Sequence, residues 1–143
     1  MTELYRLTAT EAAALIAKRE ISSVDLVRAC LDRIRSREST VQAWTHLDEQ
    51  QVLQAARAAD SMPARSALHG IPFGAKDVID SADLPTEYGS EIFKGHRPAA
   101  DAACIRTMKE AGAILMGKTV ATEFATYRPG KTRNPHNPAH TPG

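Results

Sequence analysis

The chain has 143 residues, of which 43% are hydrophobic and 24% charged. This composition is typical of a soluble globular protein and excludes disordered or collagen-like chains. The 18 lysines and arginines balance 17 aspartates and glutamates along the whole chain, so the sequence offers no basic stripe and nucleic-acid binding is not expected. The length predicts one domain or a piece of a larger one.

The N-terminal segment MTELYRLTATEAAALIAKRE is charged at Glu3, Arg6 and Glu11 and lacks the order of a signal peptide. No apolar run reaches the roughly 18 residues of a membrane span. Cys30 and Cys104 are far apart and form no Cys-x-x-Cys motif. The sequence therefore predicts a cytoplasmic protein without membrane contact.

Two helix start signals occur early in the chain. Thr8 and Glu11 have the spacing of a capping box, which predicts a short helix ending near Arg19. Ser22 and Asp25 give a second start signal, before an apolar stripe at helical spacing. That stripe, which the charged residues 35–38 close, consists of Val24, Val27, Leu31 and Ile34.

Further along, residues 41–47 are compatible with a strand, residues 48–59 predict a helix, and residues 62–66 predict a loop around Pro63. The helix over residues 48–59 would bury Val52, Ala55, Ala56 and Ala59 on one face.

Asp101 is the predicted N-cap of a later helix, and Gly112 is its predicted stop before a strand over residues 113–116. The inward face of that helix would contain Ala102, Ile105 and Met108. Strands and helices alternate, which predicts the α/β class. Residues 128–143 contain four prolines and predict an irregular segment.

The stretch LHGIPFGAKDVID, residues 68–80, resembles a buried strand but carries Lys76 in its middle. In an extended chain Gly74 and Lys76 share one face, so we expect open space beside the lysine. Burial would lower the pKa of the amine from about 10.4 and make it a general base. The alternative, which composition alone favours, is an exposed lysine or one paired with Asp77 or Asp80.

Several smaller motifs have simple structural explanations. Glu87 and Tyr88 are candidate substrate contacts, but a simple turn at Gly89 is favoured. His136 and His140 are interpreted as loop residues rather than metal ligands, because the intervening proline excludes a helix. Gly117-Lys118-Thr119 resembles the end of a phosphate-binding loop, yet residues 113–116 before it are predicted to be a buried strand. Cys104 is interpreted as a packing residue.

Three longer segments resemble the amidase signature family of serine hydrolases. LHGIPFGAKDVID resembles the family's lysine-bearing strand, and GHRPAADAACIRTMKEAGAILMGKTVATEFA resembles the helix and strand that follow. TRNPHNPAHTPG resembles the approach to the family's serine-rich loop. The motifs occur in the family's order and spacing, from about residue 5 to residue 143.

The resemblance implies an α/β fold, the N-terminal part of a single amidase domain with a mixed sheet covered by helices. Residues 1–66 would be a mainly helical lead-in, residues 67–127 the lysine strand and the following α/β units, and residues 128–143 a proline-rich loop. It also implies hydrolysis of a small-molecule amide by a Ser-cisSer-Lys triad without metal or organic cofactor. Lys76 matches the lysine that accepts a proton from the bridging serine, which activates the nucleophilic serine.

Both family serines lie beyond the segment matched by TRNPHNPAHTPG, and the sequence ends at Gly143. Ser81 and Ser90 follow Lys76, but neither lies in a glycine-flanked elbow. The resemblance thus predicts that this chain carries the lysine of the triad alone and hydrolyses no amide by itself.

Two alternatives stay open. The A subunit of a tRNA-dependent amidotransferase uses the same triad on glutamine, but its usual Asn-Met-Asp-Glu-Phe-Ala-Met-Gly-Ser and longer insert differ from residues 120–132 here, which favours a stand-alone amidase. The other alternative is a non-catalytic remnant that acts only as an assembly partner. Uncovered strand edges and apolar faces would then favour a homo-oligomer or aggregation.

Overall fold

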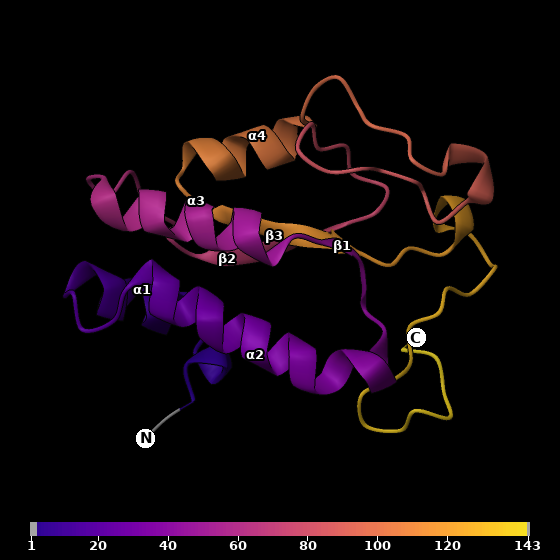
Figure 1. Ribbon diagram of the computed structural model, residues 1–143, viewed down its shortest axis with the longest axis horizontal. Coiled ribbons are helices and arrows are strands. Elements are labelled where there is room, and N and C mark those ends of the chain that lie inside the picture. The colour runs from indigo at the N-terminus through magenta and orange to yellow at the C-terminus, as the bar shows by residue number, and fades with distance from the viewer. Residues whose placement is uncertain (1–2, 143) are drawn as a thin grey trace. The chain divides into compact units, whose positions relative to one another are not determined.

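The computed structural model describes residues 3–142. Four helices and three strands follow one another in the order α1 (Ala9–Ala17), α2 (Ser23–Val41), β1 (Trp44–Leu47), α3 (Glu49–Ser61), β2 (Pro72–Lys76), α4 (Ala103–Glu110) and β3 (Ile114–Thr119) (Figure 1). Single 3-10 turns lie at Leu4–Arg6, Glu91–Phe93 and Glu123–Ala125. The predicted α/β class is confirmed, and residues 128–142 form neither helix nor strand, as expected. No helix in the described part of the chain is long and apolar enough to cross a membrane.

The chain forms two compact units, each made of three segments. The first contains Met1–Ile34, Asp48–Phe73 and Arg106–Met116, and the second contains Arg35–Leu47, Gly74–Ile105 and Gly117–Gly143.

Both predicted capping signals are confirmed. Before α1, the Thr8 hydroxyl accepts from the Glu11 N–H at 3.2 Å while the Glu11 carboxylate accepts from the Thr8 N–H at 2.8 Å. Ser22 and Asp25 make the same reciprocal pair before α2, with both backbone bonds at 3.0 Å. Each pair satisfies two backbone N–H groups at a helix start, where the helix itself supplies no acceptor. Helix α2 continues to Val41, so the strand expected over residues 41–47 begins only at Trp44.

A carboxylate from α3 caps α2 within the first unit. The two oxygens of Asp60 accept from the N–H groups of Ser23 at 2.7 Å and Val24 at 3.1 Å. A negative charge at this helix end also interacts favourably with the helix dipole. Asp60 therefore ties the end of one helix to the start of another.

The core of the first unit is built from the apolar faces of its helices. Ala12, Leu26 and Ile71 form one buried cluster. Burial of such side chains stabilises the fold by about 25 cal/mol per Å² of apolar surface. Ala55 is exposed, so its predicted place on the buried face of α3 is wrong. The other buried residues of α2 and α3 include Val27, Leu31, Val52, Ala56 and Ala59.

The three strands form one mixed sheet in the order β1-β3-β2. Strand β1 runs antiparallel to β3. Strand β2 runs parallel to β3. The Ile114 N–H donates to the Ile71 carbonyl, and the Asp77 N–H donates to the Thr119 carbonyl, both at 2.9 Å. Residue numbers thus increase in the same direction along both strands.

Strand β1 contains a bulge that changes which face its side chains reach. Trp44 pairs with Thr119, and His46 pairs with Lys118, so Thr45 is an extra residue in the ladder. Neighbouring residues of β3 point to opposite faces. Trp44 and His46 therefore lie on opposite faces of the sheet although they are two residues apart.

The α4 region differs from the sequence prediction at its edges. The helix begins at Ala103, two residues after Asp101, the expected cap. Ile105 is buried as predicted, whereas Cys104 is exposed, so its assignment as a packing residue is wrong. Gly112 follows the helix with φ +90°, a conformation that favours glycine, which confirms the predicted stop. Strand β3 runs to Thr119, past the expected end at residue 116.

Gly117→Ala should destabilise the protein by roughly 1–3 kcal/mol, because the new Cβ would overpack a full site. It would lie 2.3 Å from the His46 carbonyl oxygen, a backbone atom that cannot rotate away. Gly74→Ala is the matched control, because its Cβ would meet the Trp44 ring and Thr119 at 3.1–3.4 Å. Urea unfolding of both variants checks this, and an equal loss of stability in the two would contradict it.

Candidate functional site

Lys76 is the last residue of β2. The residues on either side of it, Ala75 and Asp77, are 3% and 2% exposed, whereas Lys76 itself is exposed. The expected burial of this lysine is thus not seen. Among the described residues no hydrogen bond or ion pair of the Lys76 ammonium group is found, so it is not paired with Asp77 or Asp80 either.

The space expected over Gly74 beside Lys76 is occupied. A Cβ atom at Gly74 would lie 3.1 Å from the ring of Trp44 and 3.2 Å from the methyl group of Thr119. A Cβ at Gly117 would meet the same ring at 3.1 Å. Trp44 therefore lies across two glycines on the Lys76 face of the sheet, and the prediction of open space is wrong.

Asp77 lies on the other face and is nearly inaccessible to solvent. Its carboxylate accepts from the N–H groups of Glu87 at 3.0 Å and Gly89 at 3.4 Å. The residue after Lys76 thus binds the far side of the loop that leaves β2.

The buried lysine of this region is Lys118 on β3, which is 0% exposed. Its amine donates to the Ile79 carbonyl and, at 2.6 Å, to the Thr86 hydroxyl. Burial lowers the pKa of Lys118 from its ordinary value of 10.5, while the charges of Asp77, Asp80 and Asp101 act in the opposite direction.

In the sequence, Lys118 stands out only as part of a motif that resembles a phosphate-binding loop. The structure confirms that no such loop forms, because Gly117, Lys118 and Thr119 are strand residues. The signal for a buried lysine was the alternation of Ile114, Met116 and Lys118, which places all three on one face once the strand extends to Thr119.

The segment after Asp77 forms the predicted turn at Gly89. Gly89 has φ +64°, and a Cβ there would lie 2.6 Å from the Ala121 carbonyl oxygen. The Tyr88 hydroxyl donates to Asp80 at 2.6 Å, which raises the pKa of the tyrosine. Glu87 lies 3.3 Å from His46 and accepts from the Gly95 N–H at 2.7 Å. Both candidate substrate contacts thus have partners inside the protein.

The serines that follow Lys76 are placed away from any catalytic arrangement in the described part of the chain. Ser81 is 0% exposed, and its hydroxyl has no hydrogen-bond partner there. The Ser90 hydroxyl donates to Glu123 at 2.9 Å. Neither serine is hydrogen-bonded to Lys76 in residues 3–142.

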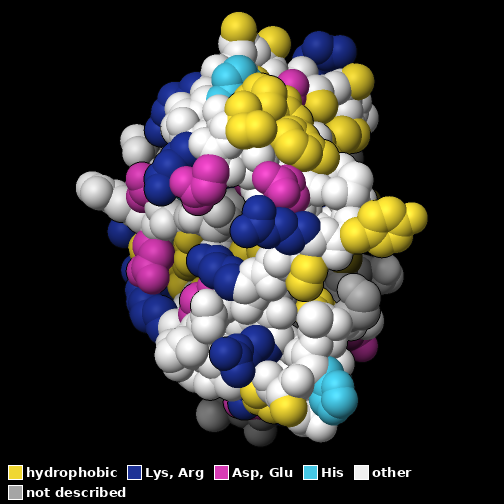
Figure 2. All heavy atoms as spheres, turned by 90° about the vertical axis from the view of Figure 1, so that its right-hand side faces the viewer, with side chains coloured by type: hydrophobic (Ala, Val, Ile, Leu, Met, Phe, Trp, Pro, Cys, Tyr) yellow, Lys and Arg dark blue, Asp and Glu magenta, His cyan; other side chains and the backbone are white. Residues whose placement is uncertain are grey.

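An aromatic cluster adjoins this loop in the second unit. Tyr88 and Phe93 have ring centroids 5.1 Å apart, and Phe93 contacts both His96 and Phe124 edge to face. Figure 2 shows hydrophobic side chains gathered in the upper part of the face that it draws. The exposed large hydrophobic residues of the second unit are Ile92, Phe93, Phe124 and Tyr127.

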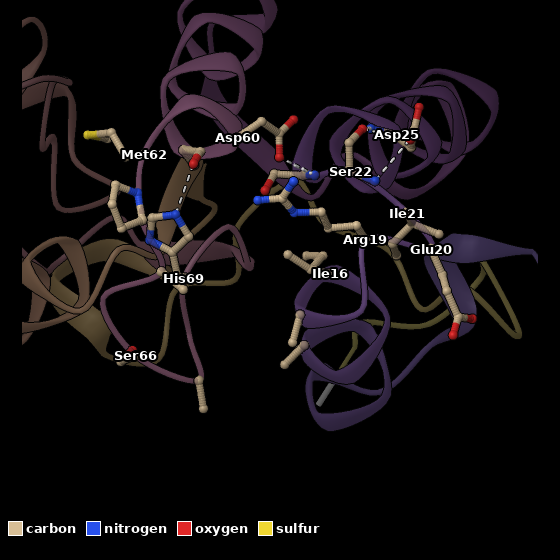
Figure 3. Close-up of a pocket in the computed structure, with 17 residues that line it drawn as sticks. Ile16, Arg19, Glu20, Ile21, Ser22, Asp25, Asp60, Met62, Ser66 and His69 are labelled. Atoms are coloured by element: carbon tan, nitrogen blue, oxygen red, sulfur yellow. Dashed lines mark hydrogen bonds between the residues drawn. The ribbon is translucent and has the colours of Figure 1, made fainter.

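A cavity of about 630 Å³ lies in the first unit, between α1, α2 and the end of α3 (Figure 3). His69 lines it, and its Nε2 donates to the Ala59 carbonyl at 2.9 Å (Figure 3). Its Nδ1 lies close to Gly112, because a Cβ atom added at this glycine would be only 2.4 Å from it. Arg19 is the sole basic side chain apart from the histidine among the lining residues, and Glu20, Asp25 and Asp60 accompany it. This mixture of charges defines no ligand, and Lys76 is not part of the lining.

The amines of the two lysines should differ in reactivity. In the folded protein we expect acetic anhydride to modify Lys76 readily and to leave Lys118 unmodified until the chain unfolds. Mass spectrometry of peptides from native and urea-unfolded protein measures both rates. Equal modification of the two lysines in the native protein would contradict this placement.

Lys118 should also affect the pH dependence of stability. Because its folded-state pKa is lowered, unfolding takes up a proton at pH values between that pKa and 10.5. The contribution of Lys118 to the free energy of unfolding is therefore fully present above pH 10.5. It is lost as the pH falls through the lowered folded-state pKa of the lysine. The unfolding free energy of the wild type should rise relative to that of Lys118→Met as pH increases toward 10.5. Urea titrations of both proteins check this, and parallel pH profiles would rule it out.

Comparison with known proteins is consistent with the motifs of this region. The Amidase family model matches residues 25–143, which include Lys76 and Lys118. The A subunit of the glutamyl-tRNA(Gln) amidotransferase of Chloroflexus aurantiacus is 42% identical to this chain over 153 residues, and that of Mycobacterium tuberculosis is 39% identical over 154 residues. Both alignments cover 100% of this chain but 31% of the relative.

Solved structures of amidases have the same fold over nearly the whole chain. The native peptide amidase from Stenotrophomonas maltophilia matches with a TM-score of 0.88 at 32% identity, over 96% of this chain and 31% of its own. An amidase family protein from Bacillus anthracis matches with a TM-score of 0.77 at 28% identity, over 85% of this chain and 25% of its own. The family model and the two amidotransferase relatives each cover most or all of the sequence, and the resemblance of its motifs is thereby confirmed: the chain belongs to the amidase family.

Proposed function

We propose that this chain supplies the lysine of a centre that hydrolyses carbon–nitrogen amide bonds, with Lys76 as the proton acceptor of a Ser-cisSer-Lys triad. The observation that carries the proposal is the position of Lys76 at the end of β2. Its side-chain nitrogen has no partner among the described residues, while Asp77 next to it is buried and hydrogen-bonded. Lys76 also lies inside the segment matched by the Amidase family model.

The chemistry needs an amine within reach of a hydroxyl group. In the proposed reaction the neutral amine of Lys76 accepts a proton from a bridging serine, which takes one from the nucleophilic serine as that oxygen attacks the amide carbonyl. The proton then passes from Lys76 through the bridging serine to the leaving nitrogen as the C–N bond breaks, which releases ammonia or an amine. Water hydrolyses the acyl-enzyme. The exposed position of Lys76 leaves its Nζ accessible to such a hydroxyl.

The nucleophile is not provided by the serines that follow Lys76. Ser81 is buried and Ser90 is bound to Glu123, so neither is available to it. Groups that act as a unit lose nearly all activity when one of them is missing. We therefore expect residues 1–143 to show no amide hydrolysis on their own.

Two kinds of amide substrate are supported by different observations. The peptide amidase has a similar fold, which agrees with a stand-alone amidase. The amidotransferase relatives are 42% and 39% identical, which supports the A subunit of a glutamine-dependent amidotransferase. The first alignment spans 153 positions for the 143 residues of this chain, so at least ten positions of that relative have no counterpart here. The chain spans about a third of each relative, so the complete activity is part of the proposal.

The proposal is tested by assaying ammonia release from glutamine and from a C-terminally amidated peptide. The 143-residue chain should be inactive, and the longest reading frame that contains it should be active. There, Lys76→Met should lower kcat by about 10³-fold or more, because it removes the proton acceptor of the triad. Lys94→Met, which removes an exposed lysine paired with Glu91, is the control and should leave kcat unchanged.

The assay has clear adverse outcomes. Full activity of Lys76→Met would refute the role of the lysine. Turnover by the 143-residue chain that is lost on Lys76→Met would refute its expected inactivity. Activity on glutamine alone would identify an amidotransferase-type enzyme, and activity on the peptide amide alone would identify a stand-alone amidase.

A further inference from the structure

We infer that Lys118 is a positioning residue for Lys76, holding the turn that follows β2 and thereby fixing the end of the strand that carries Lys76. The inference rests on the proposed function of Lys76. Lys118 itself points to the opposite face of the sheet, so it acts through the backbone and not on the reacting atoms.

The turn after β2 is bonded to both lysines through one residue. The Ile79 N–H donates to the Lys76 carbonyl at 2.9 Å, and the Ile79 carbonyl accepts from the Lys118 amine. The Asp77 N–H between them donates to the Thr119 carbonyl at 2.9 Å. A shift of this turn would therefore move the backbone of Lys76 directly.

Lys118 also holds the far side of the same loop. Its amine donates to the hydroxyl of Thr86, a residue that is 0% exposed and whose N–H donates to the His96 carbonyl at 2.9 Å. One buried amine thus joins the start of the loop at Ile79 to its middle at Thr86. Asp77 reinforces this closure through its bonds to the backbone of Glu87 and Gly89.

Loss of the amine would leave several polar groups without partners. The Ile79 carbonyl and the Thr86 hydroxyl would lose a donor, and a buried polar group that is left unpaired destabilises the fold. The buried Asp77 carboxylate would also lose its electrostatic interaction with Lys118. The least costly response is movement of the turn toward solvent, which releases the Ile79–Lys76 hydrogen bond.

The test is hydrogen exchange of the 143-residue chain, because this readout requires no activity. In Lys118→Met we expect the Ile79 amide to exchange about tenfold faster or more, because local opening of the turn exposes it. The amide of Ile114, which donates to Ile71 in the first unit, should keep its protection. Met116→Ala is the matched control, since it removes a buried side chain from the same face of β3 and keeps the Lys118 amine that bonds to Ile79 and Thr86.

A second variant covers the case in which Lys118→Met does not fold. Lys118→Met combined with Asp77→Asn removes the buried lysine and the buried carboxylate together, so that neither remains as an uncompensated buried charge. Unchanged exchange at Ile79 in either folded variant would overturn the inference. The inference would also be overturned if the exchange rate at Ile79 increased no more than it does in Met116→Ala, because such an increase would report a general loss of stability.

Kinetics separate this role from a merely structural one. In the longest active reading frame, Lys118→Met should lower kcat about tenfold or more with little change in KM, because a small misplacement of Lys76 affects the chemical step. An unchanged kcat would overturn the positioning role. If Lys76→Met keeps full activity, the proposed function of Lys76 fails, but the hydrogen-exchange result for Lys118→Met still stands. If Lys76→Met is inactive but exchange at Ile79 is unchanged in Lys118→Met, only the positioning role of Lys118 fails.

Discussion

The hydrogen bonds of the buried Lys118 amine to the Ile79 carbonyl and the Thr86 hydroxyl are the constraint on which the second unit depends. They stabilise the loop between β2 and α4, in which the single 3-10 turn Glu91–Phe93 is the regular element. The amine comes from β3, the central strand of the sheet. A buried amine costs desolvation free energy, which is offset only when its donors are satisfied. That requirement makes the position of the loop specific, because few conformations present two acceptors to one buried nitrogen.

The sheet separates two lysines with different environments. Lys76 is exposed on the face covered by Trp44, and Lys118 is buried on the face of Asp77. The separation depends on the bulge at Thr45, which lets β1 place an indole ring on one face and His46 on the other. It also depends on Gly74 and Gly117, which leave room for the ring between strands.

Membership of the amidase family explains why the lysine strand, α4 and β3 occur together. The comparisons match this chain both to amidotransferase A subunits and to a peptide amidase. The amidotransferase relatives are more similar in sequence, and the peptide amidase shares the fold over 96% of the chain. The polar interactions that hold the loop after Lys76 are a property of this chain's own residues. They hold the end of the lysine strand in place, which would preorganise the proposed site.

Several local features could be predicted from the sequence: the two helix start signals, the helix after Asp48, the stop at Gly112, the irregular tail and the family. Each of these depends on residues close together in the chain, where spacing alone decides which hydrogen bonds form. Tertiary contacts determine which lysine is buried, what fills the space over Gly74, and that Cys104 and Ala55 face solvent. These outcomes depend on strand order, on a one-residue bulge and on contacts between residues such as Trp44 and Gly117, which lie far apart in the sequence and which no local pattern encodes.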